Sequence, residues 1–292
     1  MSVTLTNPSA EWQLKASGEV VADSKGFRVT GITSNVVPNG IKLDLAGIGK
    51  NKSYELYGAF DNVKISHDAS ALSVPDGSVV VSQFSNSIAS YEFNLPKIKL
   101  TVPEQLVPNI TSTARMFMNC DLFNQPIGMW DVSNVNNMLQ MFRGCLLFNQ
   151  PIGMWDVSNV TNMGQLFFNT RFNQDISAWD VSSVTSTWLM FGDNDAFNQP
   201  IGMWDVSNVT QMIGMFSQAQ TFNQNISDWN VSNVTQMNFM LQGASRFNQD
   251  LSGWCVSLIP QAPLNFDQGA GGYRLPKPVW GKCPRGENIP TN

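Results

Sequence analysis

Apolar and polar residues recur in a fixed order through the middle of the chain, from residue 120 to residue 258. Each copy reads Phe-Asn-Gln, an aliphatic residue, Trp, Val, Val and then Met-Phe or a close equivalent. The copies begin at Phe123, Phe148, Phe172, Phe197, Phe222 and Phe247, which are 25, 24, 25, 25 and 25 residues apart. A period of this size predicts a solenoid, in which one coil buries its apolar face only against its neighbours.

Within one copy, residues 125–130 are short and extended in character, with Ile127 expected to point inward. The apolar positions that follow are Val135, Met138, Met141 and Phe142, whose spacing is typical of one face of a short helix. Asp131 or Ser133 is suited to cap that helix, which would end near Gly144. We therefore predict an α/β solenoid of leucine-rich-repeat type, in which each coil has a short parallel strand and a short helix.

The chain divides into three parts by its pattern. Residues 1–92 show short strand-like runs between turn signals and predict a β-rich N-terminal region, with degenerate coils from about residue 55 onward. Residues 93–259 hold the solenoid, beginning with a partial coil that has Gln105 in the tryptophan column. Residues 260–292 are rich in Pro and Gly and predict an irregular cap over the last coil.

Three columns of the repeat have structural explanations. The Asn of each Phe-Asn-Gln predicts a buried ladder, because an amide can bond the backbone of its own coil and of the next. The column that starts at Asp131 is explained by capping rather than by calcium, since one carboxylate per coil is not an oxygen cage. Cys120 and Cys145 occupy one column, where later coils carry Ala, so a small buried side chain explains both.

Columns that vary are the candidates for function. The residue before each tryptophan is Met129, Met154 and Met203 in three coils, which would form an exposed apolar stripe or would pack over the tryptophans. The residue after each Gln includes Asp175 and Asp250 on the same face. Trp188 replaces smaller residues in a third column, where it would anchor a partner or fill a gap beside Thr187.

Composition narrows the classes of function. The formal net charge is −5 and only 13% of residues are charged, which argues against binding to nucleic acid or to an anionic membrane surface. No apolar run approaches the roughly 18 residues of a membrane span. One histidine, His67, and no Cys-x-x-Cys pair leave no predicted metal or cofactor site. Asp175 and Asp250 are three coils apart, roughly 14 Å, too far for paired-carboxylate catalysis, so we predict no enzyme.

Two cysteines lie near the end of the array. Cys255 takes the place of the capping Asp in the last copy, and Cys283 lies in the tail beside Trp280. A disulfide between them would fasten the cap to the final coil, provided that the protein reaches an oxidising compartment.

Residues 148–163, Phe-Asn-Gln-Pro-Ile-Gly-Met-Trp-Asp-Val-Ser-Asn-Val-Thr-Asn-Met, resemble the repeat of BspA-like leucine-rich-repeat surface proteins. The resemblance covers about residues 107–259 and implies an adhesive array. Similar repeats occur in structural proteins of tailed bacteriophages, and the ending Leu-Pro-Lys-Pro-Val-Trp-Gly-Lys-Cys-Pro resembles the closing segment of such proteins. The family supplies no catalytic residues.

The start of the sequence has no basic region followed by an apolar run, so no signal peptide is predicted. We therefore expect a virion surface protein, assembled in the host cytoplasm and binding other virion proteins or a host-cell receptor. A bacterial cell-surface adhesin is the alternative.

Overall fold

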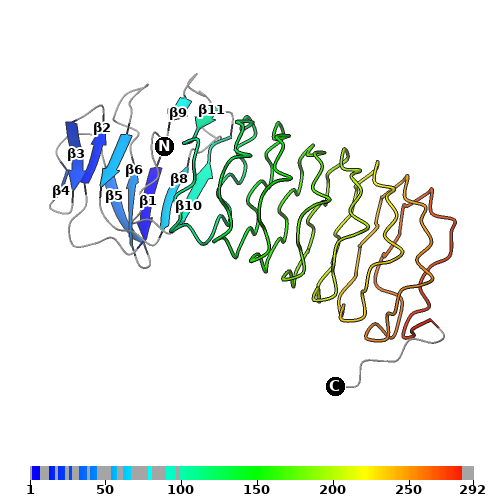
Figure 1. Ribbon diagram of the computed structural model, residues 1–292. Helices are drawn as coiled ribbons and strands as arrows, with labels where there is room; N and C mark the ends of the chain where they lie inside the picture. The colour runs from blue at the N-terminus through cyan, green and yellow to red at the C-terminus, as the bar shows by residue number, and fades with distance from the viewer. Residues whose placement is uncertain are drawn as a thin grey trace.

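A row of stacked coils follows a β-rich N-terminal part in the computed structural model of the protein (Figure 1). The structure describes residues 90–96 and 99–284, together with the strands that precede residue 81. These strands and the two that follow are β1 (Ser2–Thr6), β2 (Gln13–Ala16), β3 (Glu19–Asp23), β4 (Gly26–Phe27), β5 (Thr33–Val37), β6 (Gly40–Asp44), β7 (Tyr54–Tyr57), β8 (Asn62–Ser66), β9 (Ser78–Val80), β10 (Tyr91–Asn94) and β11 (Lys99–Thr101). No helix is present in the described part of the chain.

The N-terminal strands form three sheets. One sheet has the order β10-β8-β1-β6-β5, a second has the order β4-β3-β2-β7, and β11 pairs with β9. Most neighbours are antiparallel, as expected for short strands joined by tight turns, but β10 runs parallel to β8 and β11 parallel to β9. Residues 58–60, 72–75 and 82–84, on which the expectation of degenerate coils depended, lie outside the described residues.

Strand β10 joins the five-stranded sheet to the coils. The N–H of Phe93 donates to the carbonyl of Met116 in the partial coil, and the Phe93 ring stacks near Phe117 at 6.1 Å between centroids. The side chain of Gln125 both accepts from the N–H of Val102 and donates to its carbonyl. The sheet therefore covers the apolar end that the first coil would otherwise expose to water.

The short helix predicted in each coil is not formed. In the coil of residues 123–147, the N–H groups of Met138, Gln140, Phe142 and Gly144 donate to carbonyls of the next coil. The residues between these donors close tight turns within the coil. For example, the N–H of Met141 donates to the carbonyl of Met138 at 3.1 Å. Gln140 has φ 59° and Gly144 has φ 72°, values that an α-helix does not admit. Because the next coil already accepts hydrogen bonds from these backbone donors, a helix would leave the segment with no additional backbone hydrogen bonds.

The position of the parallel pairing also differs from the prediction. Residues 125–130, expected to be the strand, contain no bridge, because Ile127–Trp130 is a turn closed by the Trp130 N–H. Parallel bridges occur instead just before the Met-Phe segment and join successive coils. They link Ser112, Asn137, Asn162, Ser186, Gln211 and Gln236. Assignment of the array to the leucine-rich-repeat solenoids stays a prediction.

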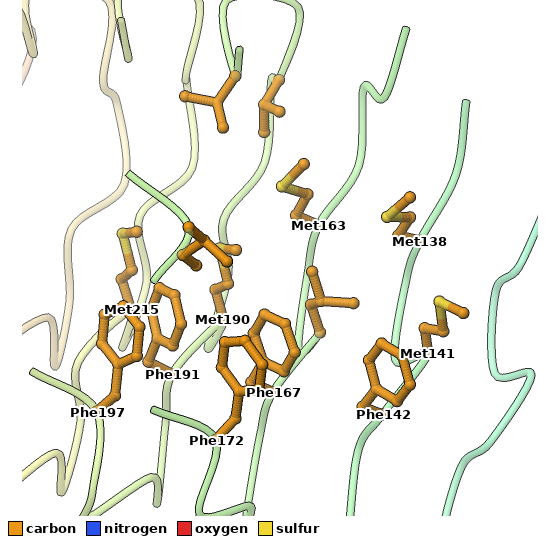
Figure 2. Close-up of a cluster of buried hydrophobic side chains, with 14 of the residues drawn as sticks. Met138, Met141, Phe142, Met163, Phe167, Phe172, Met190, Phe191, Phe197 and Met215 are labelled. Carbon is orange, nitrogen blue, oxygen red and sulfur yellow. The ribbon is translucent and has the colours of Figure 1, made fainter. Parts of the chain in front are cut away.

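Two columns of phenylalanine rings run through the centre of the coils (Figure 2). In one column, Phe142 lies 5.7 Å from Phe167, between ring centroids, with planes 1° apart. The second column lies beside it, so that Phe167 stacks on Phe172 at 4.0 Å. Met138 and Met163 fill the core next to the rings and are fully buried. Dispersion contacts of this density make adjacent coils mutually dependent.

The residues after 260 continue the stack rather than forming an irregular cap. The N–H groups of Leu241 and Gly243 donate to Phe266 and Gln268, in the pattern of the earlier coils. Asn265 and Gly269 repeat the two positive φ values. The expectation of an irregular cap is therefore corrected as far as residue 284, where the described chain ends.

Candidate binding face

The turn before each tryptophan projects one residue into solvent. The N–H of Trp130 donates to the carbonyl of Ile127, which places Gly128 and Met129 at the tip of the turn. Met129, Met154 and Met203 are 90%, 92% and 91% exposed, respectively. The structure thus shows these methionines as exposed, although they lie on a turn and not on a strand face. Ten other methionines of the described chain are buried or partly buried.

The coils with an exposed methionine share the phrase Pro-Ile-Gly-Met-Trp, whereas the other three have Asp or Asn in place of Pro and Ser in place of Gly. Proline presets φ for the turn, while Asp175 stabilises the same turn by accepting from the N–H of Ser177 at 2.9 Å. Glycine is required in the Pro form because a Cβ on Gly153 would lie 2.4 Å from the backbone oxygen of Asp175 in the next coil. Met154 is therefore presented by a closely packed turn.

A second exposed column lies two residues beyond the methionines. Asp131 accepts hydrogen bonds from the N–H and the hydroxyl of Ser133, at 3.0 and 2.6 Å. These bonds lower the pKa of Asp131 below its ordinary range, and the bond from the hydroxyl has the larger effect. The role predicted for Asp131, capping a helix, is wrong, because the carboxylate closes an Asx turn and no helix follows.

All the carboxylates in the six copies from Phe-Asn-Gln to the following Ser are exposed. They are Asp131, Asp156, Asp175, Asp180, Asp205, Asp228 and Asp250. The same six segments contain no Lys, Arg or His, and within the described residues none of these carboxylates forms an ion pair. We call the surface made by the three exposed methionines and these seven carboxylates the Met–Asp face.

Hydrogen bonds between coils repeat regularly along this face. The indole Nε1 of Trp155 donates to the carbonyl of Ile127, and each later tryptophan of the repeats does the same to the coil before it. The Oδ1 of Asn124 accepts from the N–H of Asn149 at 3.0 Å. The asparagine ladder therefore exists, but it is exposed or half-buried along its length, which corrects the expectation of a buried ladder.

The remaining predicted residues lie apart from one another. Asp175 and Asp250 are exposed in the third and sixth copies, so no pair of carboxylates converges. Trp188 is half-buried, and its Cε3 lies 3.6 Å from where a Cβ on Gly164 would be. Leu139 approaches the same point at 3.1 Å from the preceding coil. Trp188 and Leu139 thus both cover Gly164, and a role of Trp188 as an anchor for a partner stays a prediction.

The cysteines take two different states. Cys255 and Cys283 form a disulfide that ties the last described turn to the final copy. Cys120 and Cys145 are free and fully buried, and burial raises the pKa of both thiols. The Sγ of Cys145 contacts the carbonyl of Phe117 one coil earlier.

The described chain has neither a cluster of metal-binding side chains nor a helix that could span a membrane. No group of three or more His, Cys, Asp and Glu residues in this part of the protein is arranged to hold a metal ion. None of its segments is a helix of the length and hydropathy needed to cross a membrane.

Comparison with known families identifies the repeat region. The family model described as "Mycoplasma protein of unknown function, DUF285" matches residues 90–200 and 168–270, which together make up more than half of the chain. Neither the curated proteins nor the solved structures include a match to the chain. The matched residues include every copy of the phrase and all of the Met–Asp face.

Proposed function

The chain belongs to the family described as "Mycoplasma protein of unknown function, DUF285", a family of repeat proteins related to the BspA-like repeats, and on this basis we propose that it is a non-enzymatic binding scaffold. Its repeats build a rigid array, and the Met–Asp face is the part that contacts a target. The single observation that carries this proposal is the exposure of Met129, Met154 and Met203. An exposed methionine keeps its apolar surface in water, which is less favourable than burying it. A partner that covers the side chain would gain this free energy of burial, so a row of exposed methionines is typical of a contact surface.

The geometry of the three methionines suits a protein or glycan surface rather than a small molecule. Met129 and Met154 lie in adjacent coils, about 5 Å apart, and Met203 lies two coils further, at roughly 10 Å from Met154. The side chains stand on a convex turn instead of lining a pocket. Methionine is flexible and polarisable, so a row of three adapts to uneven surfaces.

We propose that the scaffold acts on the surface of a tailed-phage particle, where it binds a host-cell receptor or other virion proteins. The resemblance of the closing segment, residues 275–284, to phage structural proteins supports this setting. A bacterial cell-surface adhesin is the second candidate, and the description of the matched family as a Mycoplasma protein favours it. Both settings need the same exposed array, and no step of catalysis is part of either.

The experiment that tests the function replaces all three methionines together. The variant M129E/M154E/M203E should fold, because these side chains make few contacts, and should lose binding to whole host cells or to purified virions. Binding that is unchanged in a folded variant would refute the methionine stripe. The genes beside the coding sequence separate the two settings, since tail or capsid genes would support the virion and their absence would support the adhesin.

A further inference from the structure

The array places its negative and positive charges in different segments of each copy. Between residues 123 and 258 there are nine aspartates and three arginines. Seven of the aspartates lie on the Met–Asp face, whereas Arg143, Arg171 and Arg246 follow the Met-Phe segment or precede the next Phe-Asn-Gln. Arg143 donates to the Oε1 of Gln165 and lies over the ring of Phe168, so its contacts are with residues that follow the Met-Phe segments. No cation from these segments neutralises the seven carboxylates.

Apolar and acidic side chains alternate closely on this face. Asp131 follows Met129 by two residues, so their Cα atoms are at most about 7 Å apart. Asp156 stands in the same relation to Met154, one coil further, and Asp205 to Met203. The carboxylates have no ion-pair partner within the described chain, and the methionines are almost fully solvated.

We propose that the Met–Asp face binds a cationic polypeptide segment that also carries apolar side chains. Its Lys or Arg residues pair with the row that begins at Asp131, and its apolar residues cover Met129 and Met154. Charge complementarity selects this occupant, because an anionic polypeptide, a nucleic acid or an anionic lipid surface would place like charges against the row. The inference rests on the proposed binding function and specifies the chemistry of the partner.

The chain itself supplies the substitution that tests the charge without disturbing the turn. Asn230 occupies the column of Asp131 in the fifth copy and makes the same two bonds to Ser232, at 3.2 and 2.7 Å. The variant D131N/D156N therefore removes two charges and keeps both Asx turns. The matched control is D193N/D195N, which removes two exposed charges from the return loop after the Met-Phe segment, outside the Met–Asp face.

The probe is a synthetic peptide in which Lys alternates with Leu, followed by fluorescence anisotropy at low and high salt. We expect the natural chain to bind it and D131N/D156N to bind about tenfold more weakly, with a flatter dependence on salt. M129S/M154S should also weaken binding, and D193N/D195N should change it less than about twofold. A peptide that alternates Glu with Leu should not bind, and neither should vesicles of anionic phospholipid.

Equal binding of the Lys–Leu peptide by the natural chain and by D131N/D156N would overturn the inference, and so would binding of the Glu–Leu peptide or of the vesicles. These results leave the proposed function intact if M129E/M154E/M203E still loses binding to cells or virions. Conversely, normal binding of the triple variant to cells and virions would refute the role of the three methionines in binding, whichever peptides the protein binds. The two sets of measurements therefore separate the failure of the partner assignment from the failure of the binding scaffold.

Discussion

The indole Nε1 of Trp204 donates a hydrogen bond of 3.2 Å to the carbonyl oxygen of Ile176 in the preceding coil. The same oxygen accepts from the N–H of Trp179, so it joins a turn in its own coil to a side chain from the next. This relationship explains why the column holds tryptophan and not another large apolar residue. Phenylalanine would fill part of the space but would leave the neighbouring coil without this bond.

We predict that Trp204→Phe lowers the free energy of unfolding by about 2–4 kcal/mol, through the lost hydrogen bond and the space that the smaller ring leaves. Urea denaturation followed by circular dichroism measures the change. Trp188→Phe is the control, because that indole is half-buried and covers Gly164. An equal loss for both variants would contradict the role assigned to the column.

Gly153→Ala should destabilise the array, because its Cβ would lie 2.4 Å from the backbone oxygen of Asp175 and backbone cannot give way cheaply. Overpacking of this kind costs about 1–3 kcal/mol. Gly253→Ala is the control, one position later in the same turn of the sixth copy, since the nearest atom there, the oxygen of Ser227, is 3.9 Å away. Thermal denaturation of the two variants should separate them, and identical melting temperatures would rule out the close approach.

Limited treatment with hydrogen peroxide should oxidise Met129, Met154 and Met203 before any buried methionine. Each thioether takes one oxygen atom from the peroxide to form a sulfoxide, with release of water. Peptide mass spectrometry of the folded protein measures the order of oxidation. Early oxidation of Met138 or Met163, which are fully buried, would mean that the coils open under native conditions.

Acid should weaken the protein below about pH 4. Hydrogen bonds from Ser133 and Ser182 hold the pKa values of Asp131 and Asp180 below the ordinary value of 3.8. A carboxyl with a depressed folded pKa stabilises the fold above the unfolded pKa, and this contribution is lost as the pH falls through the folded pKa. The effect is small for exposed groups.

The stability of the natural chain should therefore be level from pH 7 to about pH 5 and decline below about pH 4, whereas D131N/D180N should decline less. Asp193 acts in the opposite sense, because partial desolvation of its carboxyl raises its pKa. Chemical denaturation at a series of pH values gives both profiles. If the natural chain and D131N/D180N lose stability in parallel as the pH falls, the Asx-turn carboxylates are not a source of the acid sensitivity.

The disulfide between Cys255 and Cys283 closes a separation of 28 residues, for which loop entropy gives about 2–4 kcal/mol. Cys283→Ser should cost an amount in this range. Thiol titration should find no reactive cysteine in native protein, two after denaturation without reductant, and four after reduction. Alkylation of Cys255 and Cys283 in native, unreduced protein would disprove the bond.

The burial of the repeated apolar columns was predictable from the sequence because these columns are set by side-chain type. Ile127, Trp130, Val132 and Phe142 are all buried, as their regular return indicated. Among the strand-like runs of the N-terminal region, the run at residues 3–6 lies within β1 and the run at residues 41–45 overlaps β6. These assignments depend on local hydrophobic alternation, which a single segment displays.

The conformation of the Met-Phe segment was not predictable in the same way. The spacing of Val135, Met138 and Phe142 suits a helix, and Gln140 gives no sign of its positive φ. The donors of the segment are satisfied by the next coil, so the decision between helix and turn is made by contacts that one copy does not contain. A signal existed four residues later, where Gly144, Asn169 and Gly243 supply residue types that accept positive φ.

The candidate face was foreseen only in part. Its methionines belong to a column that varies while its neighbours stay fixed, which separates them from the core. The alternation of Pro-Ile-Gly with Asp-Ile-Ser was visible, but its meaning as two ways of making one turn required the bonds of Asp175 and Ser177. The segment after residue 260 likewise hid a coil, because Phe266 follows Leu241 by one period but lacks the Phe-Asn-Gln phrase.

Hydrogen bonds between coils point in opposite directions on the two sides of the array. On the Met-Phe side, Phe142 N–H donates forward to Leu166, whereas Thr185 N–H and the Trp179 indole donate backward to Thr161 and Ile152. In a long α-helix every peptide dipole points one way and charge accumulates at the ends. Here the opposed dipoles offset one another, so the array can lengthen by whole copies without growing more polar along its axis. A longer array therefore carries no added electrostatic cost along its axis. Each inserted copy would extend the structure by one step of about 5 Å.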